Sequence, residues 1–245
     1  MTDEETFPFV PYDLSRRKEW FVRLLGWSFP KILHAYYKIT YEHPERLQSV
    51  ADKGCVLLPN HQTDMDTPFV RVLLKEHLNR APYYIMLNTR SKLFEYAGGI
   101  PIPQGYYVQR DHRDRKDRRA ALDCAKVQRA YAEDAMFRVL SADEILLLYI
   151  QGGRYHREPF TVRKPATVQR LLKVQKRLGR RVPFVPVSLE YEALHHPFSK
   201  VRVSVGNPIE VADDDVRPLI EHLEKEIVIT NAREVVRPPP SLLAD

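Results

Sequence analysis

The segment LLPNHQTDMD, residues 57–66, places a histidine directly after an apolar run and an aspartate five positions later. An aspartate that accepts the ring N–H of His61 fixes its tautomer and leaves the other nitrogen free to act as a general base. Positions five apart do not share a helical face, so His61 and Asp66 meet only if the chain bends between them. Asp64 is a rival partner. The purely structural alternative is a loop histidine beside an aspartate that caps the next helix.

The rest of the chain offers no protein nucleophile to accompany this histidine. There is no GxSxG elbow, and neither Cys55 nor Cys124 lies in a nucleophile context, a CxxC motif or a Cys/His cluster. We therefore expect no covalent intermediate, no metal and no bound cofactor. A histidine base without a protein nucleophile implies that a hydroxyl group of the substrate attacks. Two isolated cysteines suit a reducing compartment, and we expect a cytoplasmic location.

Strand and helix patterns alternate along the chain and must position these residues. The alternation predicts an α/β fold with a largely parallel sheet flanked by helices, and the apolar runs CVLLP and EILLLYI are typical of strands buried on both faces. The predicted strands are 55–59, 81–87, 100–110, 144–150, 182–191 and 200–211. The predicted helices are 66–78 with Thr67 as N-cap and Pro68 at the first helical position, 91–98 closed by Gly98, 115–134, and 166–179 ending at Gly179.

Polar residues come directly after three of the predicted strands. Ligands collect beyond the carboxyl ends of parallel strands. We therefore expect three loops to meet at one rim: Asn60-His61, Arg110, and Gln151-Gly152-Gly153-Arg154.

Residues 12–40 combine an Arg-Arg-Lys cluster with both tryptophans of the protein, Trp20 and Trp27. Asp13 or Ser15 is a candidate cap for a helix here, and Pro30 is expected to interrupt it. The pattern suits a helix lying on a membrane surface, because tryptophan prefers the interface; a helix packed on the domain core is the alternative. We divide the chain into a helical segment 1–42, a domain 43–235 and a proline-rich tail 236–245.

The net charge is +6, and the positive charge is concentrated. Residues 154–181 carry ten Lys or Arg against one acid, Glu158. Such a segment attracts anions: lipid head groups, a phosphorylated cofactor, an acidic carrier protein or nucleic acid. A solvated helix face explains it equally well. No recognised nucleic-acid-binding motif accompanies the charge, so we expect no nucleic-acid partner.

Several blocks together resemble the PlsC-like glycerolipid acyltransferases. NHQTDMD is similar to the family's His-x-x-x-x-Asp signature, and GYYVQR is similar to the block that ends in a phosphate-binding arginine, here Arg110. LLLYIQGGRY resembles the Phe-Pro-Glu-Gly-Thr-Arg block and supplies Gly152 and Arg154. VPFVPVSLE and VGNPIEV resemble the blocks that follow, so the resemblance spans about residues 20–211 in the family's order.

The resemblance implies direct transfer of an acyl group from acyl-CoA or acyl carrier protein to the hydroxyl of a lysophospholipid or related lipid. It implies that His61 is the general base, that Asp66 orients it, and that Arg110, Gln151, Gly152 and Arg154 hold the acceptor. The expected partners are the acyl donor and a membrane surface, to which the protein binds peripherally. Gln151 stands where the family usually has glutamate, which leaves a non-catalytic lipid-binding protein as the alternative. The sequence leaves the oligomeric state open.

Overall fold

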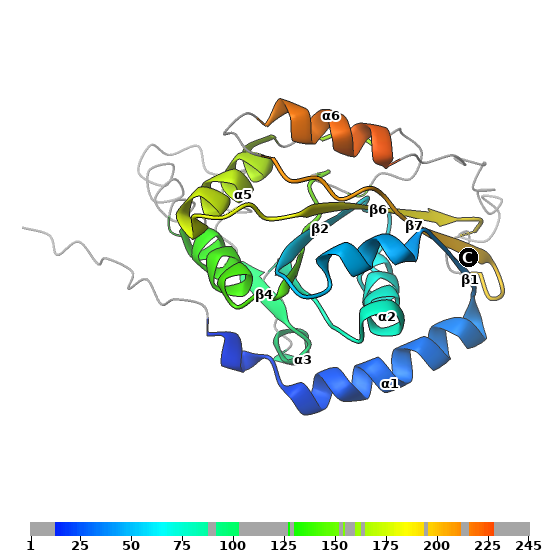
Figure 1. Ribbon diagram of the computed structural model, residues 1–245. Helices are drawn as coiled ribbons and strands as arrows, with labels where there is room; N and C mark the ends of the chain where they lie inside the picture. The colour runs from blue at the N-terminus through cyan, green and yellow to red at the C-terminus, as the bar shows by residue number, and fades with distance from the viewer. Residues whose placement is uncertain are drawn as a thin grey trace, which may run out of the picture.

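The computed structural model describes residues 13–87, 92–102, 127, 130–151, 154, 160–162, 165–193, 196–211 and 216–227. These residues form an α/β fold around a seven-stranded sheet with strand order β1-β7-β6-β2-β5-β3-β4 (Figure 1). The strands are β1 (Lys38–Glu42), β2 (Cys55–Pro59), β3 (Tyr83–Leu87), β4 (Gly99–Ile102), β5 (Ile145–Leu147), β6 (Phe184–Tyr191) and β7 (Lys200–Val205). Every neighbouring pair is parallel except β6 and β7, which confirms the predicted fold class.

Helices cover both faces of this sheet. They are α1 (Glu19–Tyr36), α2 (Asp66–Leu78), α3 (Lys92–Tyr96), α5 (Pro165–Leu178) and α6 (Arg217–Glu226), with short 3-10 helices η1 (Leu14–Arg16) and η2 (Pro44–Val50). Residues 130–141 are also helical. In Figure 1, α1 and α2 lie below the sheet and α6 lies above it.

Side-chain alternation along the central strand divides the core into two parts. Val56 and Leu58 of β2 pack with α5, α6 and the 130–141 helix, whereas Cys55 and Leu57 pack with α2, η2 and the end of α1. All five residues of β2 are buried, as the apolar run predicts for a strand covered on both sides. The strand is thus fixed from both faces, which makes its carboxyl end a rigid base for the loop that follows.

The structure corrects the prediction for residues 12–40. The helix α1 continues through Pro30, although proline removes one backbone hydrogen bond, because its inner face packs on α2 and is held there. Residues 38–42 form the edge strand β1, so the helical segment ends earlier than expected. Asp13 does act as a cap, but for η1, where its side chain accepts the N–H of Ser15 at 2.9 Å. The division at residue 42 stays a prediction.

The N-cap predicted for α2 is wrong. The helix begins at Asp66, with Met65 in the cap position, and Thr67 lies inside the first turn. The Thr67 hydroxyl instead lies 2.9 Å from the hydroxyl of Tyr149. The chain before the helix winds around the carboxylate of Asp66, and the cap position lies two residues before the predicted one.

Other boundaries differ by a few residues, and some elements had no sequence signal. The closures at Gly98 (φ +96°) and Gly179 (φ +67°) are confirmed, since both adopt the left-handed conformation that glycine favours. The strands predicted at 144–150 and 200–211 are shorter in the structure, where they form β5 and β7. The 3-10 helix η2 and the helix α6 were not expected. Residues 103–110 of one predicted strand and 115–126 of one predicted helix lie outside the described residues.

Candidate active site

The site lies at the carboxyl edge of the three central strands. His61 follows β2 by two residues, Gln151 follows β5 by four, and Tyr191 is the last residue of β6. Because β2 is parallel to both β5 and β6 and lies between them, these three residues emerge at the same edge. Two of the three predicted loops therefore meet; Arg110 and Gly152 lie outside the described residues.

The chain bends between His61 and Asp66 and brings their side chains together. Nδ1 of His61 lies 2.8 Å from Oδ2 of Asp66. The same oxygen accepts the backbone N–H groups of Gln62 at 2.6 Å and Thr63 at 2.9 Å. Asp66 is completely buried, so these donors replace its water. The turn is thus built around one carboxylate, and the five-residue spacing follows from it.

The second oxygen of Asp66 is held by a residue far away in the sequence. The hydroxyl of Tyr191 donates to Oδ1 at 2.6 Å. Burial, followed by the nearby charge of Asp66, raises the pKa of Tyr191 well above its usual value. The phenol therefore stays neutral and remains a hydrogen-bond donor. Together these contacts fix both oxygens of Asp66 and leave it one orientation toward the imidazole.

Tyr149 fixes the plane of the imidazole. Its ring stacks on that of His61 with centroids 4.2 Å apart and an angle of 25° between the planes. Its hydroxyl lies beside Thr67, and burial raises its pKa well above the usual value. The imidazole is thus held at its edge by Asp66 and on its face by an aromatic ring.

Amide side chains tie the loop to the sheet. Asn60 donates to the carbonyl of Leu189 at 2.9 Å and accepts the N–H of Leu189 at 2.7 Å, so it extends the sheet pairing by one step. Gln62 donates to the same carbonyl at 2.9 Å. Asn60 and Gln62 are both buried. They hold the backbone on either side of His61 against β6.

Gln151 supports the histidine from the other side. Its side chain is buried, and its Oε1 accepts the backbone N–H of His61 at 2.7 Å. The sequence suggested a residue that faces the acceptor, but this oxygen is used inside the protein. Glutamine and glutamate share this acceptor oxygen, so the departure from the usual glutamate preserves the contact.

Asp64 is not the partner of the histidine. It is exposed and forms an ion pair with Arg154, whose side chain is half exposed. This pair lies at the rim of the site, and exposed pairs of this kind are weak. Arg154 therefore remains available to an anionic ligand that outcompetes Asp64.

The described residues leave part of the His61 side chain open. Its side chain is 21% exposed, and no described residue hydrogen-bonds to its Nε2. A ring nitrogen that is oriented, unpaired and accessible is suited to take a proton from a bound hydroxyl group. The geometry is that of a histidine oriented by a buried carboxylate.

The basic segment 154–181 turns out to be divided between different places. Three of its arginines form ion pairs with carboxylates of residues 133–143: Arg170 with Glu133, Arg177 with Asp134, and Arg180 with Asp143. The carboxyl end of α5 leads into β6 and so lies at the amino edge of the sheet, away from His61. These pairs favour the structural interpretation for this half of the segment.

Sequence reasoning did not single out Tyr149, Tyr191 or Gln62 as part of the site. Tyr149 and Tyr191 each stand near the carboxyl end of a predicted strand, the position where ligands and catalytic groups collect. A polar aromatic residue there is a usable signal. Nothing in the sequence marks Gln62, because its role depends on the carbonyl of Leu189 in a distant strand.

The fold is thus a mostly parallel α/β sheet with an aspartate-oriented histidine at the carboxyl edge of its central strands. A sequence model of the Acyltransferase family matches residues 38–190, from the start of β1 to the residue before the last of β6. The chain therefore belongs to the acyltransferases of the PlsC-like family, which its sequence blocks resemble. A comparison with curated proteins finds no match. Family membership supports acyl transfer as the class of reaction.

Proposed function

We propose that the protein transfers a fatty acyl group from acyl-CoA or acyl carrier protein directly to the hydroxyl of a lysophospholipid or related lipid. The observation that carries the proposal is the His61–Asp66 pair, with Nδ1 held at 2.8 Å and Nε2 open. Nε2 takes the hydroxyl proton as the oxygen attacks the thioester carbonyl. The C–S bond then breaks, and the imidazolium returns the proton to the leaving thiolate.

Asp66 supports this step through charge and orientation. Its carboxylate stabilises the imidazolium that forms during attack, and its contact with Nδ1 selects the tautomer with a free Nε2. A positioned general base typically contributes about 10²–10⁴-fold to the rate. No protein nucleophile is required, and the acyl group passes directly from sulfur to oxygen.

The acceptor is proposed to bind at the rim beside Arg154. A phosphate head group can displace the Asp64 carboxylate, because it carries more charge and pairs bidentately with guanidinium. Arg110 and Gly152 follow from the resemblance as further acceptor-binding residues. The alternative of a non-catalytic lipid-binding protein rested on Gln151, and its contact with His61 N weakens that alternative.

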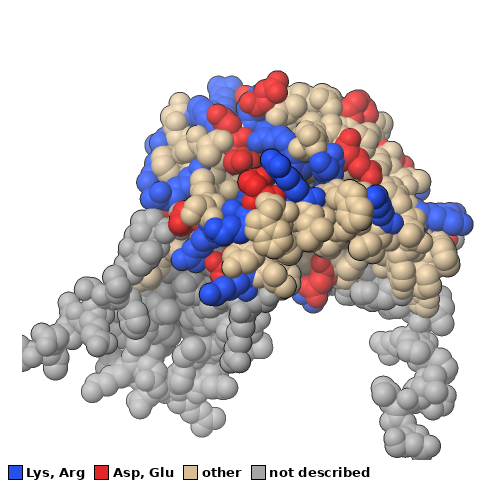
Figure 2. Space-filling view, turned by 90° about the horizontal axis from the view of Figure 1, so that it is seen from below, with Lys and Arg blue, Asp and Glu red and all other residues tan. Residues whose placement is uncertain are grey.

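We further propose that the protein binds peripherally to a membrane through the outer face of α1. Trp20 and Trp27 are 61% and 63% exposed, while the opposite face of α1 packs on α2. Further exposed apolar side chains are Leu24 and Ile32 of α1 and Leu93 and Phe94 of α3. Figure 2, a view from the α1 side, shows basic side chains, and acidic ones between them, among uncharged surface. Large exposed aromatics with flanking cations suit the interface of an anionic bilayer. No helix among the described residues is long and apolar enough to cross one.

The decisive experiment replaces His61 by alanine. We expect acyl transfer to fall by about 10²–10⁴-fold while the protein stays folded, because the His61 side chain is partly exposed. The thermal unfolding midpoint should fall, since buried Asp66 loses its contact with Nδ1. Turnover is measured with labelled acyl-CoA and acyl carrier protein thioesters against a panel of lipid hydroxyls. His222→Ala, on α6, is the matched control and should keep full activity. Full activity in His61→Ala would refute the proposal.

A further inference from the structure

A recess lies between α1 and α2, at the edge of the sheet opposite to His61. Its volume is about 550 Å³, within the range of about 300–1,000 Å³ typical of small-molecule sites. Its lining includes Ala81, which precedes β3, and Glu144, which precedes β5. Helix α2 contributes Arg71, about 8 Å along the helix from Asp66, and Asn79, about 20 Å along it at 1.5 Å per residue, and the described residues that line the recess include none of those of the active site. The recess is therefore separate from the active site.

The lining of this α1–α2 recess is strongly positive. It contains five cationic side chains and two acidic ones: Arg17, Arg23, Arg71, Lys75 and Arg80 against Glu19 and Glu144. The walls between them are apolar and come mostly from the inner face of α1. Lys75, Asn79, Glu19 and Arg23 are exposed and mark the mouth, whereas Arg71 and Val72 are buried and form the floor.

The floor of the recess holds a buried guanidinium that has no counter-ion among the residues that the structure describes. Arg71 is 7% exposed, and no carboxylate of the described residues forms an ion pair with it. One of its N–H groups donates to the carbonyl of Ala97 at 2.5 Å, out of the five that a guanidinium carries. Burial lowers the pKa of Arg71 to about 10, so it still carries its charge at neutral pH. A buried charge is normally paired, and here the pairing is incomplete.

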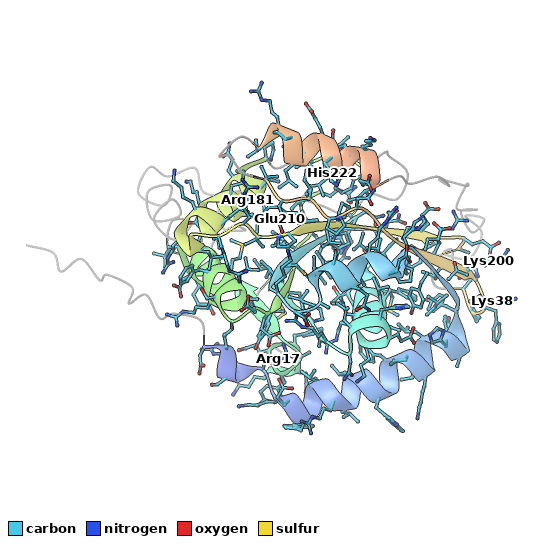
Figure 3. The ribbon with its side chains drawn as sticks, viewed as in Figure 1. Arg17, Lys38, Arg181, Lys200, Glu210 and His222 are labelled. Atoms are coloured by element: carbon cyan, nitrogen blue, oxygen red, sulfur yellow. The ribbon has the colours of Figure 1, made fainter. Side chains whose placement is uncertain are left out.

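The acids of the recess do not supply the missing partner. Arg17 and Arg80 both approach Glu144 at 3.6 Å, and Arg17 also contacts Glu19 at 3.3 Å. Figure 3 shows Arg17 at the start of α1, on the side that faces the sheet. Lys75 donates to the side chain of Asn79. Both carboxylates are thus engaged by Arg17 and Arg80, and the excess of positive charge remains at Arg71 and the mouth.

We propose that the α1–α2 recess binds the phosphate group of a phosphate ester, as a second site distinct from the active site. The excess charge exceeds what a single carboxylate neutralises and suits the two negative charges of a phosphate monoester. Guanidinium groups recognise phosphate through paired hydrogen bonds. The phosphate belongs either to a soluble ester or to a lipid head group at the membrane on which α1 lies. The site does not depend on the proposed acyl transfer, because its test measures binding.

The test uses the full-length protein and inorganic phosphate, titrated by calorimetry at an ionic strength held constant with chloride. We expect saturable binding that raises the thermal unfolding midpoint. Arg71→Met should weaken phosphate binding by about 10- to 100-fold, the range for losing a hydrogen bond to a charged group. The double variant Arg23→Gln/Lys75→Gln changes only exposed residues at the mouth and should weaken binding by about tenfold. It keeps the test decisive if Arg71→Met does not fold.

The matched control is Lys53→Gln, an exposed lysine outside the recess that pairs with Glu210. It should bind phosphate like the wild type. Vesicles of phosphatidylcholine with and without phosphatidylglycerol separate the two sources of phosphate. If vesicle binding requires phosphatidylglycerol and falls in Arg71→Met, the ligand is a lipid head group; if only dissolved phosphate responds to Arg71→Met, it is a soluble ester. No saturable phosphate binding in the wild type, or equal losses in Lys53→Gln and the recess variants, would overturn the proposal.

Discussion

Replacing Tyr191 by phenylalanine removes one hydroxyl from the active site and leaves the aromatic ring in place. The lost group donates to Oδ1 of Asp66 at 2.6 Å, and it is the donor that the structure shows for that oxygen. The other oxygen keeps its contacts with His61 and the loop N–H groups. The change therefore tests whether Asp66 must be held from both sides to act on the histidine.

Two effects follow from the geometry. A hydrogen bond to a charged group contributes about 1.5–3 kcal/mol, and Asp66 is too buried for water to replace it freely, so stability should fall by about that amount. For a chain of this size that corresponds to a lower thermal unfolding midpoint by roughly 3–12 °C. A carboxylate that loses a donor also attracts a proton on the neighbouring imidazole more strongly. The acid limb of the pH–rate profile should therefore move to higher pH, while the plateau rate changes little.

The assay is kcat/KM against pH for the wild type and the variant, with thermal unfolding measured in the same buffers. Tyr149→Phe is the matched control, because it loses a buried hydroxyl that contacts Thr67 rather than Asp66. It should lower stability without moving the acid limb. An unmoved acid limb in Tyr191→Phe, or an equal movement in both variants, would refute the reasoning.

The same tyrosine predicts the alkaline stability of the fold. The folded pKa of Tyr191 is raised above its unfolded value of 10.0, so the folded state holds the proton more tightly. Its contribution to stability is complete below pH 10 and is lost as the pH rises through the folded pKa. The wild type should lose unfolding free energy above pH 10 more steeply than Tyr191→Phe. Equal slopes in urea unfolding series at these pH values would contradict this assignment.

Three further results are expected. Burial raises the pKa of Cys55 to about 12, so in a Cys124→Ser background a thiol reagent at pH 8 should react only after unfolding; fast reaction of the folded protein would contradict its burial. Trp20→Ser/Trp27→Ser should reduce binding to anionic vesicles with normal turnover of a soluble acceptor, whereas an unfolded double variant would show that both side chains serve the core. Gln151→Glu should lower kcat/KM for anionic acceptors relative to neutral ones by about tenfold. This is the effect expected of two unit charges about 10 Å apart at an effective dielectric constant near 20. A uniform change across the acceptor panel would show that residue 151 does not distinguish charge.

The central strands and their loops could be predicted from the sequence because their signals are local. An apolar run that ends in a proline and an asparagine–histidine pair identifies both β2 and the point where it ends. The alternation of such runs with helical segments predicts a parallel sheet, and a parallel sheet predicts a shared carboxyl edge. The meeting of His61 and Gln151 follows from these steps without any knowledge of side-chain contacts.

The parts that could not be predicted depend on contacts between distant segments. The five-residue bend works because Asp66 accepts two backbone N–H groups of its own loop, which no periodicity reports. Tyr191 lies 125 residues from the aspartate to which it donates. The local sequence at Pro30 predicts an interruption of the helix, but the packing of α1 on α2 outweighs the cost of the missing hydrogen bond. That Arg71 is buried without a carboxylate partner among the described residues is likewise a property of the folded neighbourhood and not of the sequence around it.

The pairing of β1 with β7 has a consequence for how the chain assembles. The two strands are parallel neighbours, and Glu42 contacts Ser204 across a separation of 162 residues. At about 5–20 residues per second, a ribosome needs roughly 8–30 s to deliver β7 after β1 has emerged. During that time the β1 edge has no strand to pair with, and closing so long a loop is slow. The pairing of β1 therefore waits for β7, and the amino-terminal strand, the first to be synthesised, is among the last to be paired.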